Sequence, residues 1–164
     1  MTGIKRPTLP LTGGCPCGLI RYEITAMPLA LYACHCTDCQ RKSGSAFALN
    51  MPLPAGAFRI VQGSPKGWSS TGPSGEVTTA WFCGDCSGRL YGERPSRPEM
   101  MMLRAGTLDD TSWLVPAVHI FMRSAQAWDG SLRPAMAENV PCYDTMPEDF
   151  TPLVKAWREK IGEA

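Results

Sequence analysis

The chain has 164 residues, of which 44% are hydrophobic and 19% charged, and its formal net charge at pH 7 is +1. These values fit a single globular domain that is large enough to bury its own core. The near-zero charge gives no reason to expect nucleic acid or an anionic membrane as a partner. The longest uncharged run, residues 43–58, contains prolines and is too short to span a bilayer. No apolar segment follows the basic residues near the N-terminus, so we expect no secretory signal and a cytoplasmic location.

Turn-forming residues are frequent along the chain. Fifteen prolines and sixteen glycines predict many turns between short elements, and therefore a mainly β architecture. Alternating apolar residues, such as Ile20, Tyr22 and Ile24, predict half-buried strands. The predicted strands cover residues 19–24, 29–33, 47–51, 58–61, 66–70, 77–82, 89–91, 99–105 and 115–121. Gly13-Gly14 predicts a turn that leads into the first cysteine pair.

The C-terminal segment has a helical periodicity. Thr151 followed by Pro152 predicts an N-cap and a proline in the first helical position. The apolar residues that recur at helical spacing are Phe150, Leu153, Val154, Trp157 and Ile161. We therefore expect an amphipathic helix at the end of the chain.

Seven of the eight cysteines fall in three short clusters, Cys15/Cys17, Cys34/Cys36/Cys39 and Cys83/Cys86. In a reducing compartment such clusters favour metal binding over disulfides or simply buried thiols, which are the alternatives. A turn with C-x2-C spacing brings two sulfur atoms to a tetrahedral metal ion with little strain. Gly84 is expected to supply any unusual backbone dihedral in the Cys83–Cys86 turn.

The number of ligands predicts two different zinc sites. Cys15, Cys17, Cys83 and Cys86 can close one four-thiolate site, which would be coordinatively full and structural. Cys34, Cys36 and Cys39 remain, and three protein ligands with one open position are typical of catalytic zinc. A thiol that binds such a zinc loses its proton and becomes a nucleophile. Alternatively, both sites are structural, and Cys142 or a histidine completes the second one.

Four further residues are candidates for substrate contacts. Arg41 and Lys42 follow the triplet and would hold a substrate carboxylate or offset thiolate charge, unless they are ordinary surface charges. Phe47 and His119 would line the pocket, although a histidine on an apolar strand face is by default a core residue. His35 points away from Cys34 and Cys36 if these face the metal, so a hydrogen-bonded structural role is at least as well supported as a catalytic one.

Four sequence blocks resemble the glutathione-dependent formaldehyde-activating enzyme family, also called the centromere protein V/GFA domain. The blocks are Gly13-Gly14-Cys15-x-Cys17-Gly18 with Arg21-Tyr22; Cys34-His35-Cys36-x2-Cys39 with Gly44-Ser45-x-Phe47; Phe82-Cys83-x2-Cys86-Ser87-x2-Leu90; and Gly106-Thr107-Leu108 with Pro116 and His119-Ile120. The resemblance covers roughly residues 12–130. The third block of the family often has glycine directly after its second cysteine, whereas this chain has Ser87 before Gly88.

The resemblance implies an Mss4-like fold of short antiparallel strands around zinc knuckles. It implies a structural zinc on Cys15, Cys17, Cys83 and Cys86 and a catalytic zinc on Cys34, Cys36 and Cys39. We expect a flexible N-terminal lead over residues 1–10, a zinc-binding domain over 11–130, and a C-terminal extension over 131–164 whose helix packs on the same domain.

The implied activity is that of a carbon–sulfur lyase or synthase with two zinc ions per chain. It would add a thiol, such as glutathione as co-substrate, to a small aldehyde such as formaldehyde. The main alternative is a zinc-stabilised protein-binding module without catalysis, and a third hypothesis is zinc storage or sensing.

Overall fold

The computed structural model describes residues 6–72, 74–129 and 140–163. The chain divides into two compact units, each of which holds one cysteine cluster. Of the described residues, the three-cysteine unit comprises 30–50, 115–129 and 140–163, and the four-cysteine unit comprises 6–29, 51–72 and 74–114. The predicted mainly β architecture is confirmed, because most elements of the described residues are short strands. Residues 1–5 of the predicted lead, and 131–139 and 164 of the predicted extension, lie outside the described residues.

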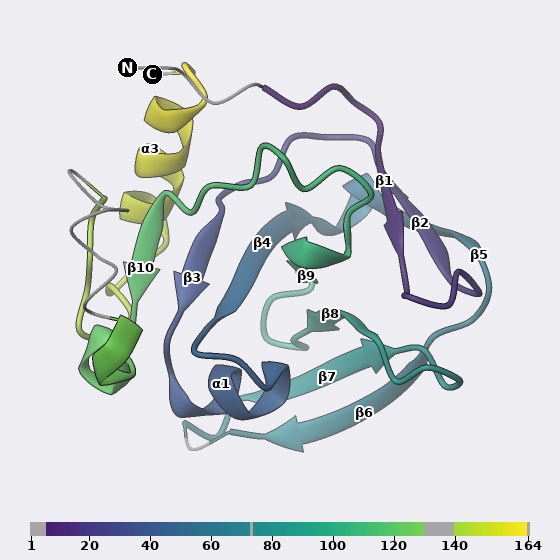
Figure 1. The fold of residues 1–164 in the computed structure, drawn as a ribbon, viewed down its shortest axis with the longest axis horizontal. Coiled ribbons are helices and arrows are strands. Elements are labelled where there is room, and N and C mark those ends of the chain that lie inside the picture. The colour runs from purple at the N-terminus through teal and green to yellow at the C-terminus, as the bar shows by residue number, and fades with distance from the viewer. Residues whose placement is uncertain (1–5, 73, 130–139, 164) are drawn as a thin grey trace. The chain divides into compact units, whose positions relative to one another are not determined.

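The three-cysteine unit contains strands in the order β10–β3–β4 (Figure 1). Strand β3 (Tyr32–Cys34) pairs parallel with β10 (Val118–Ile120) and antiparallel with β4 (Ala48–Pro54), whose residues after position 50 belong to the other unit. Helix α1 (Thr37–Ser43) connects β3 to β4, and Gly44 ends it with a φ of 65°. The short helix η3 (Met122–Ser124) follows β10.

Helix α3 (Thr151–Lys160) closes the chain and packs against β10. It buries Leu153 and Trp157, as the apolar periodicity predicts. The predicted cap was wrong by one residue: Phe150 is the N-cap and Thr151 already belongs to the helix. The cause is Asp149, whose Oδ1 accepts a 2.7 Å hydrogen bond from the Thr151 amide and so satisfies a donor that the helix itself leaves open.

The four-cysteine unit contains two groups of antiparallel strands. One group has the order β1–β2–β5 and consists of β1 (Leu11–Gly14), β2 (Arg21–Ile24) and β5 (Phe58–Gln62). The other has the order β9–β8–β7–β6 and consists of β6 (Lys66–Thr71), β7 (Val77–Phe82), β8 (Arg89–Glu93) and β9 (Met100–Arg104) (Figure 1). Two 3-10 helices, η1 (Ala55–Ala57) and η2 (Ala105–Thr107), precede β5 and follow β9.

Four predicted elements need correction, and the first is the strand over 29–33, which the structure places at Tyr32–Cys34. Gly13-Gly14 is part of strand β1 and not of a turn, and Gly13 allows a close approach because a Cβ there would lie 2.3 Å from Tyr22 Oη. Strand β4 continues past residue 51 to Pro54. The last strand covers only Val118–Ile120, because Phe121 adopts a left-handed conformation with a φ of 59° and ends it.

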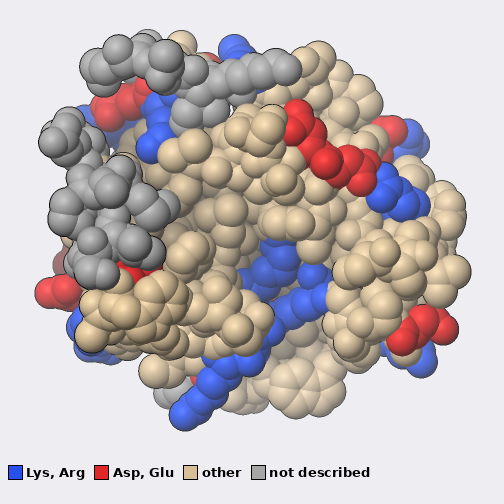
Figure 2. Space-filling view, viewed as in Figure 1, with Lys and Arg blue, Asp and Glu red and all other residues tan. Residues whose placement is uncertain are grey.

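Positively and negatively charged residues are mixed on the surface of the protein. On the face seen in Figure 2, Lys and Arg occur together with Asp and Glu on a surface made mostly of other residues. This mixture fits the net charge of +1. Among the helices of the described residues, none has the length and apolar composition needed to cross a membrane.

Candidate metal centres and active site

The four-cysteine cluster joins two loops of one unit. Cys15 and Cys17 lie between β1 and β2, and Cys83 and Cys86 lie between β7 and β8. The Sγ atoms of Cys15 and Cys17 are 3.4 Å apart, those of Cys17 and Cys83 are 3.7 Å apart, and all four sulfur atoms lie within 4.8 Å of one another. Tetrahedral zinc with Zn–S bonds of about 2.3 Å places its sulfur ligands about 3.8 Å apart. The four cysteines therefore fit a closed zinc–thiolate site.

Backbone hydrogen bonds shape both loops. The Cys15 amide donates to Ile20 O at 3.1 Å, and the Cys83 amide donates to Gly88 O at 3.0 Å. In the second loop Ser87, not Gly84, has a left-handed conformation, with a φ of 59°. Gly88 allows the two loops to meet, because a Cβ at this position would lie 2.6 Å from Pro16 Cδ. The Cys83–Cys86 loop and its contact with the first loop therefore depend on Ser87 and Gly88, the two residues that follow Cys86.

The environment of the four-cysteine cluster favours thiolates at two of its members. Burial by itself raises the pKa of Cys15, but hydrogen bonds from the Ile20 amide and from the neighbouring cysteines outweigh it and lower the pKa to about 6. The Gly88 amide, followed by the Cys17 amide, lowers the pKa of Cys86. The Leu19 amide lowers the pKa of Cys17, but the neighbouring cysteines and burial outweigh it and raise the pKa to about 12. Because cysteine binds metal as thiolate, a bound cation would favour ionisation of all four thiols together.

The three-cysteine cluster lies where β3 leads into α1. Strand β3 ends at Cys34, Cys36 is the N-cap of α1, and Cys39 lies in the first turn of that helix. The Cys36 Sγ accepts a 3.3 Å hydrogen bond from the Cys39 amide, as a capping side chain does. The three Sγ atoms lie within 4.8 Å of one another. A strand end and a helix cap therefore bring the triplet together without a contribution from distant loops.

The described residues supply no fourth ligand to the triplet. Within residues 6–72, 74–129 and 140–163, no further cysteine, histidine or carboxylate ligand atom joins Cys34, Cys36 and Cys39 at metal-ligand spacing. Cys142 is exposed and lies beside β10, where its backbone forms an isolated parallel β-bridge with that of His119. The chemistry of three thiolates with one open position fits a zinc ion that can accept an exogenous ligand.

The three thiols impede one another's ionisation. Their mutual hydrogen bonds, and then burial, raise the pKa of Cys34 far above its ordinary value. The hydrogen bond from Cys34 lowers the pKa of Cys36, but Cys39 and burial outweigh it and the pKa is raised. Three thiolates at this spacing repel, and a bound divalent cation offsets that repulsion.

Asn50 is a buried polar residue beside the triplet. Its side chain is on the same face as that of Cys34, since Asn50 pairs with Tyr32 and residues two apart share a face. Its Nδ2 lies 4.0 Å from Cys39 Sγ, within reach of a weak N–H···S hydrogen bond. Asn50 is 5% exposed. Asn50 was not among the residues predicted from the sequence, where its only signal is a carboxamide between apolar residues of a predicted strand.

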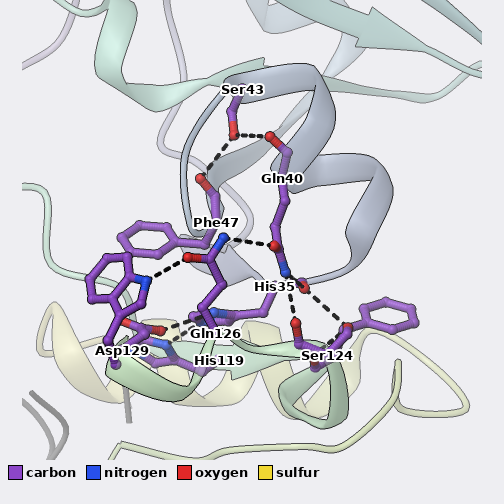
Figure 3. Close-up of polar contacts among 10 residues, drawn as sticks. His35, Gln40, Ser43, Phe47, His119, Ser124, Gln126 and Asp129 are labelled. Atoms are coloured by element: carbon purple, nitrogen blue, oxygen red, sulfur yellow. Dashed lines mark hydrogen bonds and ion pairs between the residues drawn. The ribbon is translucent and has the colours of Figure 1, made fainter. Parts of the chain in front are cut away.

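The His35 side chain lies on the side of β3 opposite the Cys34 side chain. It is fully buried, its Nε2 lies 2.9 Å from His119 Nδ1, and its Nδ1 lies 3.2 Å from Asp129 Oδ2 (Figure 3). The hydrogen bond between the two imidazole rings joins His35 to His119, and the tautomers of the rings determine which nitrogen donates. His35 therefore has the hydrogen-bonded structural position that was one of its two interpretations.

Gln40 ties α1 to the segment after β10. Its Nε2 donates to the carbonyl oxygens of His35 and Ser124, at 2.7 and 2.8 Å, and its Oε1 accepts from Gln126 Nε2 at 3.1 Å (Figure 3). Ser124 Oγ also donates to His35 O, at 3.1 Å. These contacts hold the turn between Cys34 and Cys36 in place. The sequence pattern contains no signal for the contacts of Gln40 with Ser124 and Gln126, because these residues are more than 80 positions away from it.

The residues predicted to contact substrate divide into two groups. Phe47 and His119 both lie against the His35 ring, with centroids 5.3 and 5.2 Å away, so they belong to the face opposite Cys34. Arg41 and Lys42 are exposed on α1, and Lys42 Nζ lies 4.0 Å from Asp38 Oδ2. The structure thus brings Phe47 and His119 together and leaves Arg41 and Lys42 at the surface of the helix that carries Cys39.

Comparisons with known proteins agree with this geometry. A curated Sordaria macrospora protein, provisionally named as a glutathione-dependent formaldehyde-activating enzyme, is 27% identical over 92 residues. That match covers 52% of this chain and 38% of the relative, so the chain spans well under two thirds of the relative's length. The crystal structure of a Rhodobacter sphaeroides protein has a TM-score of 0.50 and 21% sequence identity. It covers 61% of this chain and 89% of its own, which shows a similar fold.

A family model provides the broader match. The model described as glutathione-dependent formaldehyde-activating enzyme matches residues 10–124, which is more than half of the chain and includes both cysteine clusters. The chain therefore belongs to the glutathione-dependent formaldehyde-activating enzyme family.

Proposed function

We propose that this protein is a carbon–sulfur lyase or synthase that joins a small thiol to a small aldehyde, with glutathione and formaldehyde as the pair named by its family. The observation that carries the proposal is the three-cysteine cluster, for which the described residues provide three ligands and no fourth. A cluster of this kind suits exchange of an external ligand, whereas the four-cysteine cluster suits a structural role. The proposal therefore includes two zinc ions per chain.

The chain's own residues hold the reactants rather than supply a nucleophile. When bound at Cys34, Cys36 and Cys39, zinc would bind a thiol and favour loss of its proton. Thiols add to small aldehydes without a catalyst, so the protein needs to supply only thiolate formation and orientation. Cys36 caps α1, and Gln40 donates a hydrogen bond to the backbone between Cys34 and Cys36. These contacts hold the backbone that carries the three sulfur atoms, which supports a fixed orientation of the bound thiol.

Helix α1 also offers positive charge for a thiol that carries carboxylates, as glutathione does. Arg41 and Lys42 follow Cys39 by two and three positions and are exposed to solvent. In this proposal they bind a substrate carboxylate and affect KM more than kcat. Phe47 and His119 support His35 from the side opposite Cys34, and this proposal assigns them no direct contact with the substrate.

The test is the exchange of ¹³C-formaldehyde with its glutathione adduct, followed by NMR exchange spectroscopy with the zinc-loaded protein. We expect the wild type to accelerate exchange over the uncatalysed rate. Cys36→Ser and Cys39→Ser should each abolish the acceleration and lower the zinc content by one ion per chain, while the protein stays folded.

Cys142→Ser is the matched control, because Cys142 is exposed and lies outside both clusters. It should retain the wild-type rate and zinc content. A zinc-loaded wild type that exchanges no faster than buffer would reject the enzymatic proposal and favour a zinc-stabilised binding module.

A further inference from the structure

A side-chain hydrogen bond closes the segment that carries the triplet into a loop. Gln40 directly follows Cys39, and its Nε2 donates to His35 O, between Cys34 and Cys36, at 2.7 Å (Figure 3). The closed loop contains Cys36 and Cys39, and Cys34 immediately precedes it. Because one carboxamide closes this loop, its orientation bears directly on the relative positions of the three sulfur atoms.

The orientation of this carboxamide is set by a chain of hydrogen bonds. Gln40 Nε2 also donates to Ser124 O at 2.8 Å, and Gln40 Oε1 accepts from Gln126 Nε2 at 3.1 Å. Gln126 Oε1 in turn accepts from Trp128 Nε1 at 2.5 Å. Backbone carbonyls only accept and an indole N–H only donates, so one orientation of the two carboxamides satisfies every contact. The chain therefore runs in one direction, from the exposed Trp128 to His35 O.

Other contacts of the same segment also converge on His35. Ser124 Oγ donates to His35 O at 3.1 Å, and Asp129 Oδ2 lies 3.2 Å from His35 Nδ1 (Figure 3). The His35 amide donates to Ile120 O at 3.0 Å. Residues 120–129 thus hold His35 at its amide, its carbonyl and its ring. The residue that they hold is the one between two of the three cysteines.

Gln126 supplies the N–H group that selects the orientation of Gln40. With the Gln40 carboxamide reversed, its oxygen would face two carbonyl oxygens, and the loop would lose the hydrogen bond that closes it. A displacement of about 1 Å in a reacting group can cost about 100-fold in rate. A residue that holds this loop closed can therefore control the rate without touching a substrate.

We propose that Gln126 is a positioning residue for the three-cysteine cluster. Its Nε2–H holds Gln40 in the orientation that closes the loop, which keeps the three sulfur atoms in the geometry at which a bound thiol reacts. The inference rests on the proposed function, because it requires the thiol to react at this cluster. It adds a residue that lies beyond the range matched by the family model, residues 10–124.

The test separates loss of the hydrogen bond from loss of shape. Gln126→Glu keeps the shape of the side chain and an acceptor for Trp128, but a carboxylate cannot donate to Gln40 Oε1. Gln126→Leu removes both polar atoms. Ala127→Glu is the matched control, because it adds the same charge at the neighbouring exposed position.

Each variant is measured as full-length, zinc-loaded protein in the formaldehyde–glutathione exchange assay. Cobalt(II)-substituted protein provides a second readout, because its sulfur-to-metal charge-transfer bands respond to the arrangement of the sulfur ligands whether or not the protein is active. Competition with a chromophoric chelator measures the affinity for each zinc ion, and urea unfolding measures the stability of the fold.

We expect Gln126→Leu to lower kcat about 10-fold and Gln126→Glu about 100-fold, the range typical of replacing residues that orient metal ligands. The glutamate variant is the worse one, because its carboxylate repels Gln40 Oε1. The KM for glutathione should stay within about twofold, while the cobalt bands shift and one zinc ion binds about 10-fold more weakly. Ala127→Glu should match the wild type within about twofold in every measurement. Should Gln126→Leu not fold, Gln126→Met provides the same loss of the donor on an unbranched side chain.

Three results would overturn the inference alone. Both Gln126 variants within about twofold of the wild-type kcat, with unchanged cobalt bands, show that this chain does not control the cluster. A lower free energy of unfolding with unchanged kcat and cobalt bands shows a role in folding only. A raised KM at unchanged kcat places Gln126 in substrate binding instead. A wild type without thiol-dependent exchange rejects the proposed function itself, and this result differs from an active wild type whose rate is insensitive to Gln126.

Discussion

Asp109 illustrates how single side chains hold the four-cysteine unit together. It accepts two hydrogen bonds from the Arg21 guanidinium, one of them 2.9 Å long, and a third from Thr12 Oγ1 at 2.6 Å. The Arg21 contact, and then that of Thr12, lowers the pKa of the Asp109 carboxyl below its ordinary value of 3.8. Arg21 and Thr12 lie on β2 and β1, next to the Cys15–Cys17 loop, so the ion pair connects the loop's flanking strands to the segment after η2.

A lowered carboxyl pKa predicts the direction of the pH dependence. The folded state binds the Asp109 proton less tightly than the unfolded chain, so the stabilisation is fully present above pH 3.8 and is lost as the pH falls through the lowered pKa. We expect Asp109→Asn to cost about 0.5 kcal/mol at pH 6, the value of an exposed ion pair, and less at pH 3. Urea unfolding at both pH values measures the free energy of unfolding of each protein.

The control for this prediction is Glu99→Gln, which removes an exposed carboxylate from the same unit. Its difference from the wild type should be smaller at pH 6 than that of Asp109→Asn. A difference between wild type and Asp109→Asn that grows as the pH falls would contradict the assigned role, because it would have the opposite sign.

Helix α3 shows how a single element depends on tertiary packing. Its ten residues are too few for a stable isolated helix in water, so its stability comes from the apolar face that it buries. Trp157 is 1% exposed and Leu153 fully buried, and the helix contacts β10, which pairs in turn with β3 and its terminal Cys34. The helix thus supports the strand pair next to the three-cysteine cluster.

Truncation of the buried tryptophan tests this dependence. We expect Trp157→Ala to lower the free energy of unfolding by about 3–5 kcal/mol, the usual cost of removing a buried aromatic side chain. Arg158→Ala, one position along and exposed, should change it by less than about 0.5 kcal/mol. Thermal unfolding by circular dichroism compares the two, and equal stabilities would show that α3 is not packed as described.

The whole chain carries two clusters that differ in ligand number and in the kind of backbone that supports them. Four sulfur atoms from two separate loops form one, and three from a single strand–helix turn form the other. A full tetrahedral site holds its metal more firmly than one that keeps an exchangeable position. Since each cluster lies in its own unit, the two metal ions should be released separately.

Stepwise chelation tests that expectation. We expect two zinc ions per chain by elemental analysis, with the ion of the three-cysteine cluster lost first. Its loss should abolish the thiol–aldehyde exchange at little cost to folding, and loss of the second should coincide with unfolding of the four-cysteine unit. The measurement is a chromophoric zinc assay run beside circular dichroism. Simultaneous release of both ions, or a single ion per chain, would contradict it.

Local sequence pattern determined a large part of this protein. Cysteine spacing alone divided seven thiols into a set of four and a set of three, and both sets meet at metal-ligand spacing in the structure. Alternating apolar residues located most of the strands, and the periodicity of residues 150–161 located α3. These features are readable because each arises from contacts between near neighbours, or from a repeat that fixes which residues share a face.

Tertiary structure alone decided the surroundings of the triplet. The sequence alternation shows that Asn50 is on one face of its strand, but only the pairing of β3 with β4 places that face beside Cys39. In the same way, the parallel pairing of β10 with β3 brings His119 to His35 across 84 positions. Such contacts depend on which strands become neighbours and in what register, and a periodic pattern does not encode either.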